Sequence, residues 1–297
     1  MPASISKQTL VIAGITVNVF SQPSAVDSPV TVLFLLHGRT RSDADSEPIA
    51  RGILEEVGRQ REGSQAQGTQ ADDLIIVTFD HRNHGARLVD KLANWHWEED
   101  PAKSNVRHAV DMYAIQTGTA NDVSFLIDFL PAYLYPNDER TVVRWGVAGV
   151  SLGGHSTWIT LKNDPRVTFG IPIIGCPDYL TLMSERAAQS KVPVAPPYFP
   201  VSFLAYVRAH DPAAAPHTAD APRGANPFRG KRVLVLCGKE DTLVPWSASR
   251  RFVEELDVGE EGVKEVWVEE GTGHRCSEGM VKRAGEFVWK QALVRGQ

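Results

Sequence analysis

The chain has 297 residues and a mass of 32.6 kDa, a length that a single α/β domain can reach. Hydrophobic residues make up 42% of it and charged residues 23%, which excludes a disordered chain and supplies a sizeable core. The 31 Lys and Arg residues against 36 Asp and Glu give a net charge of −5, which argues against a nucleic-acid binder because no basic field is present.

The sequence also bears on where the protein works. Its first eleven residues lack the charged and then apolar regions of a signal peptide. The longest apolar run, Val30–Leu36, is far shorter than the roughly 18 residues that cross a bilayer. Three cysteines, Cys176, Cys237 and Cys276, form neither a disulfide framework nor a metal-ligand spacing. We therefore expect a cytoplasmic protein without a membrane span.

Strands and helices are predicted to alternate along the chain. The pattern predicts a hairpin over residues 8–20, centred on Ala13-Gly14, and two strands buried on both faces at Val30–Leu36 and Asp73–Phe79. Further strands are predicted at residues 141–150, 167–174, 231–236 and 263–268. A helix that contains Ile53, Leu54 and Val57 is predicted after an acidic cap region around residues 43–47. Further helices are predicted at residues 109–130, 152–162, 247–256 and 277–294, with Pro131 ending the first of these four.

This alternation implies right-handed crossovers. The predicted fold class is α/β, with a mostly parallel central sheet of about eight strands and helices on both faces. Residues 58–71 are polar and rich in Gln and Gly, so we expect a surface loop there. Residues 179–228 are too long for a structureless connection, and we expect a small cap at the carboxyl edge of the sheet. The whole chain, 1–297, is expected to form one domain with this cap inserted.

One motif carries a specific chemistry. Gly149-Val150-Ser151-Leu152-Gly153 fits G-x-S-x-G, between an apolar strand and a helical stretch. A nucleophilic serine in a strained strand-to-helix turn needs that context, since flanking glycines let strand and helix approach closely. An ordinary glycine-rich turn is the alternative.

A serine nucleophile needs a base that is itself oriented by a carboxylate. Asp241 follows the strand at 231–236, and His274 follows the strand at 263–268. The order Ser151, Asp241, His274 is nucleophile, acid and base, and parallel strands would bring all three to one edge. Asp178, after the strand at 167–174, is an alternative acid; the neighbouring Glu240 is expected to be a solvated carboxylate.

From residue 8 to about residue 288 the chain resembles an α/β-hydrolase. The resemblance is carried by His37-Gly38, DHRNHG (80–85), GVSLGG (149–154), GKEDTLVP (238–245) and GTGH (271–274), in family order. It implies a catalytic triad of Ser151, Asp241 and His274, with the backbone amides of Arg39 and Leu152 as the oxyanion hole. DHRNHG departs from the commoner D-x-R-G-x-G at Asn83, which leaves the triad untouched.

Substrate-binding candidates are aromatic. Trp95 lies in the cluster Asn94-Trp95-His96-Trp97, which could line the pocket mouth or cover the sheet edge. Four aromatic residues of the cap could form an apolar acyl pocket or the cap's own core: Tyr198, Phe199, Phe203 and Tyr206. His37 is expected to make structural hydrogen bonds. His81 and His84 have no nearby acidic ligand, so no metal is predicted, and the absence of a dinucleotide fingerprint or P-loop predicts no cofactor.

These features predict a serine hydrolase that cleaves a carboxylic ester, lactone or thioester of a small-molecule acyl substrate through an acyl-enzyme. The alternatives are a peptidase-like hydrolase of the same fold, a ligand-binding sensor and a non-hydrolytic lyase, because fold does not determine chemistry. The oligomeric state and the acyl and alcohol parts of the substrate stay open at this stage.

Overall fold

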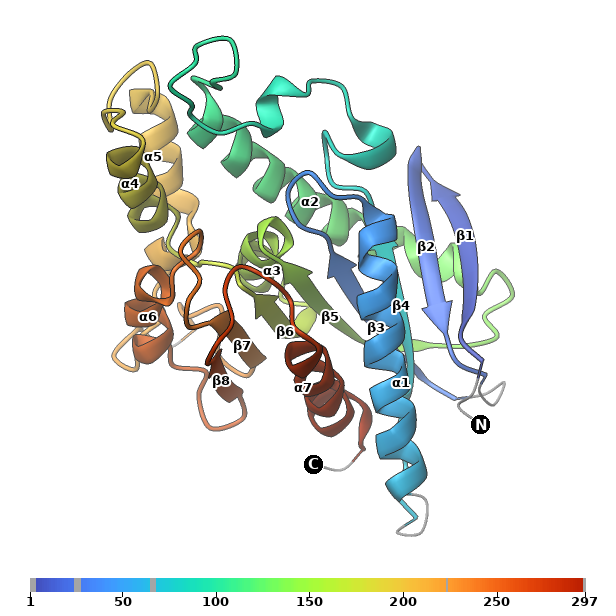
Figure 1. Cartoon of the computed structure of the whole chain (residues 1–297). Helices are drawn as coiled ribbons and strands as arrows, with labels where there is room; N and C mark the ends of the chain where they lie inside the picture. Colours follow the sequence, from blue (N-terminus) through green and yellow to red (C-terminus); the bar gives the residue numbers. More distant parts are fainter. Residues whose placement is uncertain (1–3, 24–27, 65–67, 223, 296–297) are drawn as a thin grey trace.

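The computed structural model describes residues 4–23, 28–64, 68–222 and 224–295. These residues form an eight-stranded sheet in the order β1-β2-β4-β3-β5-β6-β7-β8 (Figure 1). The strands are β1 (Ser6–Ile12), β2 (Ile15–Ser21), β3 (Val30–Leu36), β4 (Asp73–Phe79), β5 (Val142–Val150), β6 (Val167–Ile173), β7 (Arg232–Gly238) and β8 (Val263–Glu269). All neighbours from β4 to β8 are parallel, whereas β1 and β2 form an antiparallel hairpin that pairs with β4. The predicted mostly parallel sheet is confirmed.

Helices cover both faces of this sheet, as predicted. Two of them, α1 and α7, contribute buried side chains to one apolar core, and α2, α3 and α6 contribute to the other. Their bounds are α1 (Glu47–Ser64), α2 (His108–Leu134), α3 (Leu152–Asn163), α6 (Trp246–Glu255) and α7 (Glu278–Val288). A short π-helical turn at Trp289–Leu293 extends α7.

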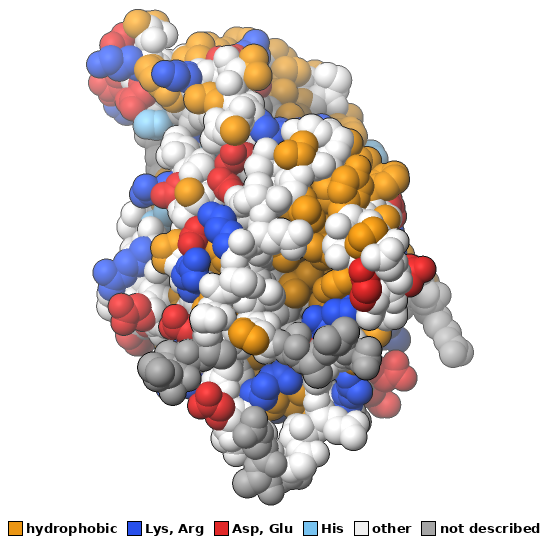
Figure 2. All heavy atoms as spheres, turned by 90° about the vertical axis from the view of Figure 1, so that its right-hand side faces the viewer, with side chains coloured by type: hydrophobic (Ala, Val, Ile, Leu, Met, Phe, Trp, Pro, Cys, Tyr) orange, Lys and Arg blue, Asp and Glu red, His pale blue; other side chains and the backbone are white. Residues whose placement is uncertain are grey.

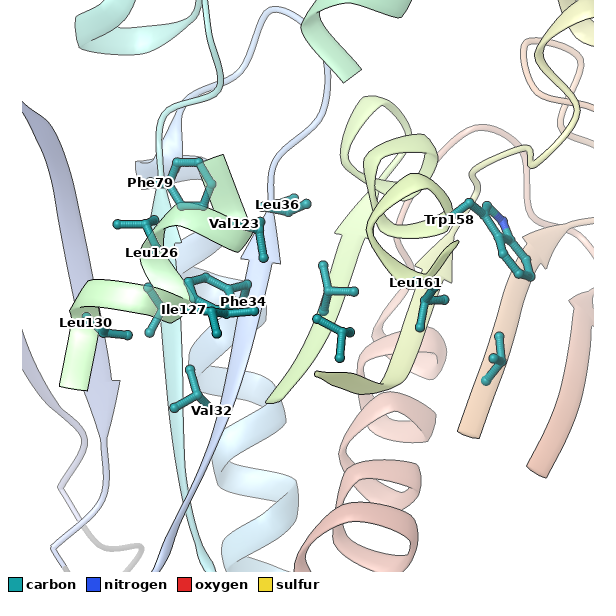
Figure 3. Packing of buried hydrophobic residues seen from close by; sticks show 14 of the residues in the cluster. Val32, Phe34, Leu36, Phe79, Val123, Leu126, Ile127, Leu130, Trp158 and Leu161 are labelled. Atoms are coloured by element: carbon teal, nitrogen blue, oxygen red, sulfur yellow. The ribbon is translucent and has the colours of Figure 1, made fainter. Parts of the chain in front are cut away.

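The central strand β3 shows why its sequence is continuously apolar. Successive side chains of a strand point to opposite faces, so a strand covered on both sides needs hydrophobic residues at every position. Val32, Phe34 and Leu36 pack into the core under α2 and α3 (Figure 3), and Leu33 and Leu35 pack into the core under α1 and α7.

Two predicted boundaries are wrong, both at helix ends. Helix α2 continues through Pro131 to Leu134. A proline in the last turn removes one backbone hydrogen bond, and Tyr135 N still donates to Pro131 O at 2.8 Å while Leu134 packs against the core.

Helix α1 likewise extends to Ser64, so the predicted surface loop at 58–71 is helical in its first half; residues 65–67 lie outside the described residues. Tertiary contacts stabilise this polar turn, because Arg61 donates to Asp72 O at 2.7 Å and lies 3.4 Å from the Asp73 carboxylate.

Residues 179–228 leave the sheet between β6 and β7. They contain α4 (Tyr179–Gln189), α5 (Val201–His210) and a single turn at Pro212–Ala214, and we refer to them as the insertion. Helices α4 and α5 lie side by side at one end of the sheet (Figure 1). The insertion joins the rest of the fold through aromatic packing, in which the rings of Tyr113 on α2 and Tyr179 on α4 are 4.7 Å apart.

Hydrophobic side chains gather on the face beside the β1–β2 edge (Figure 2). Exposed apolar residues on the elements there include Val11 of β1 and Phe129 and Tyr133 of α2, and α2 contacts β1. These exposed side chains therefore come from two elements, β1 and α2.

No helix in the described part of the chain has the length and apolar composition needed to cross a membrane.

A buried carboxyl group links the insertion to α2. Asp211, at the end of α5, accepts a hydrogen bond from Tyr179 N at 2.9 Å and another from the Tyr113 hydroxyl, and it is only 5% exposed. Burial raises the pKa of Asp211 to about 7, and the nearby Asp178 adds to the increase. A carboxyl with a raised pKa binds more protons in the folded than in the unfolded state, so the free energy of unfolding falls as the pH rises through this range.

We therefore expect Asp211→Asn to flatten the pH dependence of stability. Between pH 4.5 and 8 the wild type should lose on the order of 3 kcal/mol more than the variant, since one pKa unit corresponds to about 1.4 kcal/mol. Urea unfolding followed by circular dichroism measures this, with the exposed Glu62→Gln as control. Parallel curves for wild type and Asp211→Asn would contradict the account.

Candidate active site

Ser151 occupies a strained turn between β5 and α3. Its φ of +55° and ψ of −107° lie outside the regions that side chains normally adopt, and its amide donates to Ile173 O on β6 at 2.9 Å. Gly149 and Gly153 make the turn possible, because a Cβ on Gly149 would lie 2.3 Å from the Gly153 backbone. The Ser151 hydroxyl does not cap α3, so the turn leaves it free for another partner.

That partner is His274. Its Nε2 lies 2.9 Å from Ser151 Oγ, and its Nδ1 lies 2.8 Å from Asp241 Oδ2. The three residues follow β5, β7 and β8, whose parallel pairing places their carboxyl ends on one edge of the sheet. The structure thus brings the three predicted side chains into one hydrogen-bonded row.

Asp241 is fixed on its other side by the backbone. Its Oδ1 accepts from Leu243 N and Val244 N, both at 2.9 Å, and its side chain is fully buried. The carboxylate is therefore held with one oxygen toward His274. Asp178, the alternative acid, instead caps α4 by accepting from Thr181 N at 2.9 Å.

The loop that carries His274 is tied to the loop that carries Asp241. Glu240 N donates to Thr272 O at 3.0 Å, and Thr272 N donates to Glu240 Oε2 at 2.8 Å. The expected solvated carboxylate at Glu240 agrees with this structure, because the residue is exposed and, within the described ranges, only one of its two carboxylate oxygens accepts from the protein. The spacing of Glu240 and Asp241 does not reveal the contact, because it depends on how two distant loops meet.

The amides of Arg39 and Leu152 lie beside Ser151. Leu152 opens α3, where a backbone N–H has no partner inside the helix. In the described part of the chain neither amide donates to a protein acceptor. Both remain available for a negatively charged oxygen, which is consistent with the predicted roles.

His37 orients the peptide that carries the Arg39 amide. Burial lowers the pKa of His37 to about 4, so the ring is neutral. Its Nε2 accepts from His81 N at 3.0 Å, which leaves the proton on Nδ1 to be donated to Gly38 O at 2.7 Å. Arg41 N also donates to Gly38 O, at 3.2 Å. Since the carbonyl is held on one side of a planar trans peptide, the Arg39 N–H points to the other. The expected structural role of His37 agrees with these contacts.

Three cavities share Arg39 and Leu243 as lining residues, and Ser151 lines two of them. The first has a volume of about 470 Å³ and is lined by Ser151, His274, Cys276 and the 37–41 segment. The second, about 320 Å³, lies between Arg39, α4 and the loop after Asp241. A third, smaller one reaches from Ser151 to α2 and α4. Arg39 lines all three.

The aromatic candidates lie elsewhere. Trp95 is 42% exposed and lines a separate hollow of about 380 Å³ that also contacts Arg39, so it sits near the mouth and not beside Ser151. Phe199 is fully buried, and it packs with Tyr198 and Phe203 against α2 and Trp97; Tyr206 is half-exposed on α5. None of these four insertion residues lines any of the three cavities. Tyr198, Phe199 and Phe203 belong to the apolar cluster between the insertion and α2, so the structure favours the alternative that these three form a core, whereas Tyr206 does not belong to it.

The histidine-rich loop after β4 is a packing cluster. The rings of His37 and His81 stack at 3.9 Å, and His84 lies 5.4 Å from His37. Within the described ranges no group of three His, Cys, Asp or Glu side chains is placed to hold a metal ion.

Sequence reasoning missed two other residues of the smallest cavity. Arg186 on α4 and Gln116 on α2 line it together with Ser151. Neither belongs to a motif, and only the docking of the insertion on α2 brings them to the serine.

No family model matches this sequence, and a search of curated proteins finds no match either. Solved structures do match. TT1662 from Thermus thermophilus is 19% identical, with a TM-score of 0.66 over 97% of this chain and 99% of its own. An S-formylglutathione hydrolase from Agrobacterium tumefaciens is 18% identical, with a TM-score of 0.56 over 96% and 92%. The Pyrococcus furiosus esterase Pf2001 is 17% identical, with a TM-score of 0.50 over 97% and 93%.

At these identities the likeness concerns the fold. The chain has the α/β-hydrolase fold, with the sheet and helices that its sequence predicts. The activity of this chain has to be inferred from the residues at the carboxyl edge of its sheet.

Proposed function

We propose that this protein is a serine hydrolase that cleaves a carboxylic ester of a small molecule through an acyl-enzyme. The observation that carries the proposal is the continuous row from Asp241 through His274 to Ser151, with contacts of 2.8 and 2.9 Å. Such a row is the arrangement by which a weak hydroxyl nucleophile is activated. Similar structures that include an esterase and an S-formylglutathione hydrolase by name are in line with it.

The first half of the reaction forms the acyl-enzyme. Ser151 Oγ attacks the carbonyl carbon while its proton passes to His274 Nε2, and the imidazolium that forms is stabilised by Asp241. The carbonyl oxygen becomes negative, and the amides of Arg39 and Leu152 donate to it. The intermediate collapses when the C–O bond to the alcohol breaks and His274 returns the proton to the leaving oxygen.

The second half consumes water by the same route. His274, neutral again, takes a proton from a water molecule that attacks the acyl carbon, and the two amides again hold the negative oxygen. Collapse of this intermediate releases the acid, and the proton on His274 returns to Ser151 Oγ. Atoms and charges then balance as ester plus water giving acid plus alcohol.

The insertion acts as a cap in this proposal, within a single domain that spans residues 1–297. Leu182, Met183 and Arg186 of α4 line the cavity beside Ser151. A substrate acyl or alcohol group bound there would be partly removed from water, which strengthens the electrostatic interactions at the carbonyl.

Ser151→Ala tests the proposal. We expect this variant to fold normally and to lose turnover by at least about 10⁴-fold, because no nucleophile remains. It should also lose labelling by a fluorophosphonate probe, while the exposed Ser247→Ala keeps both. An ester panel and a peptide panel on the same samples separate esterase from peptidase. Turnover by Ser151→Ala equal to that of the wild type would refute the proposal.

Glu240 provides a second test, since it holds the His274 loop without touching the substrate. Glu240→Ala removes the acceptor of Thr272 N, and we expect kcat to fall by about 10- to 100-fold with little change in KM, as for a small misplacement of the base. Glu240→Gln keeps an acceptor oxygen and should recover most of the rate. Equal rates in the two variants would show that the tether does not position His274.

A further inference from the structure

Two arginines stand at the cavities beside Ser151 without a negatively charged partner. Arg39 and Arg186 both line the second cavity and the smallest one, the latter shared with Ser151 itself. Arg39 donates to Asn94 O at 3.5 Å, and Arg186 donates to Leu243 O at 2.9 Å. No carboxylate in the described ranges lies within 4 Å of either guanidinium.

Two other partly buried arginines, Arg87 and Arg140, pair with carboxylates, whereas Arg232 donates to the backbone carbonyl of Gln291. Arg87 lies 2.9 Å from the Asp122 carboxylate, and Arg140 contacts Asp73 at 2.5 Å. A carboxylate therefore accompanies some of the shielded guanidinium groups and not others. Arg39 and Arg186 combine the lack of a carboxylate with a place on the walls of the cavities next to the candidate triad.

Holding two positive charges there is unfavourable in the free protein. Burial lowers the pKa of Arg39 to about 10, and the charge of Arg186 lowers it further in the same direction. Burial also lowers the pKa of Arg186. An anion bound between the two guanidinium groups would offset both effects, because its charge attracts both side chains.

Gln116 adds an independent observation. This α2 side chain is 2% exposed and lines the same small cavity, yet its amide makes no hydrogen bond within the described residues. Its amide nitrogen and oxygen are not among the enclosed polar atoms that lack a partner in the described ranges, so they face the cavity, where a ligand can reach them. Its NH₂ group can donate to an anionic oxygen beside the two guanidinium groups.

The remaining charges around the site do not cancel the arginines. Glu185 lines the second cavity, but its residue is exposed and forms no ion pair with either arginine. Asp45 in the first cavity is paired with Arg41, and Arg275 lies there as well. The surroundings of Ser151 therefore carry an excess of positive charge on a protein whose net charge is −5.

We propose that Arg39, Arg186 and Gln116 bind a carboxylate group of the substrate, so that the ester cleaved at Ser151 is that of an anionic molecule. This inference deepens the proposed function and rests on it. The planar fork of a guanidinium matches the two oxygens of a carboxylate, and the local positive field attracts an anion that the overall charge would repel.

Two pairs of esters test this assignment. In the first pair the carboxylate is on the acyl part: 4-nitrophenyl hemiglutarate against its neutral isostere, 4-nitrophenyl 5-methylhexanoate. In the second it is on the alcohol part: 4-carboxyphenyl butanoate against 4-carbamoylphenyl butanoate. In one of the two pairs we expect the wild type to favour the anionic ester at least tenfold in kcat/KM. An anionic preference below tenfold in both pairs, or a preference for the neutral ester in both, would overturn the proposal.

Arg186→Gln identifies the residue responsible. It should reduce the anionic preference by about 10- to 100-fold, as expected for loss of a charge-assisted hydrogen bond. Arg186→Lys keeps the charge without the fork and should fall in between. Arg208→Gln, on the exposed face of α5, is the matched control and should keep the wild-type preference. An unchanged preference in Arg186→Gln would contradict the assignment.

A binding experiment separates this proposal from the proposed function. Titration calorimetry with glutarate uses the Ser151→Ala protein, where turnover plays no part. Binding that weakens at least tenfold in the Ser151→Ala/Arg186→Gln protein supports the carboxylate site even if Ser151 proves not to be a nucleophile. No binding, or equal binding to both proteins, overturns the carboxylate site while leaving ester cleavage by Ser151 standing.

Discussion

The parallel pairing of β5, β6, β7 and β8 is the constraint on which the rest of the site depends. Parallel strands end on the same edge, so the residues that follow β5, β7 and β8 are brought together although they are far apart in the sequence. Ser151, Asp241 and His274 each occupy such a position. The continuous apolar cores on both faces of the sheet keep this edge rigid, which holds three short loops in register.

Around this edge, backbone groups do much of the positioning. Two amides hold Asp241, a carbonyl held by His37 sets the direction of the Arg39 amide, and the Glu240–Thr272 contacts tie two loops together. The strain at Ser151 fits the same picture. A residue in an unfavourable conformation persists only when its surroundings over-determine it, and here the tightly packed Gly149 and Gly153 do so.

The charge distribution complements this geometry. An acidic protein would repel an anionic substrate at long range, yet the cavities beside Ser151 are lined by arginines that the fold leaves without ion pairs. The insertion contributes one of them, so it shapes both the walls of the site and its electrostatic potential. In the proposed function, the same segment that covers the nucleophile also selects the charge of what reaches it.

The sequence by itself determined the strands β3 and β4 to the residue, the alternation of strands and helices along the chain and the three candidate residues after β5, β7 and β8, because apolar runs and strand-to-loop motifs are local signals. It did not determine where helices α1 and α2 end. The polar end of α1 is stabilised by contacts of Arg61 with Asp72 and Asp73, and the turn of α2 that contains Pro131 is stabilised by packing against the core. The sequence also left open whether the insertion's aromatic residues line a pocket. The docking of α4 and α5 on α2 decided where these aromatic side chains lie, and it also brought Arg186 and Gln116 next to Ser151. This docking joins segments that are distant in the sequence, so no local pattern encodes it.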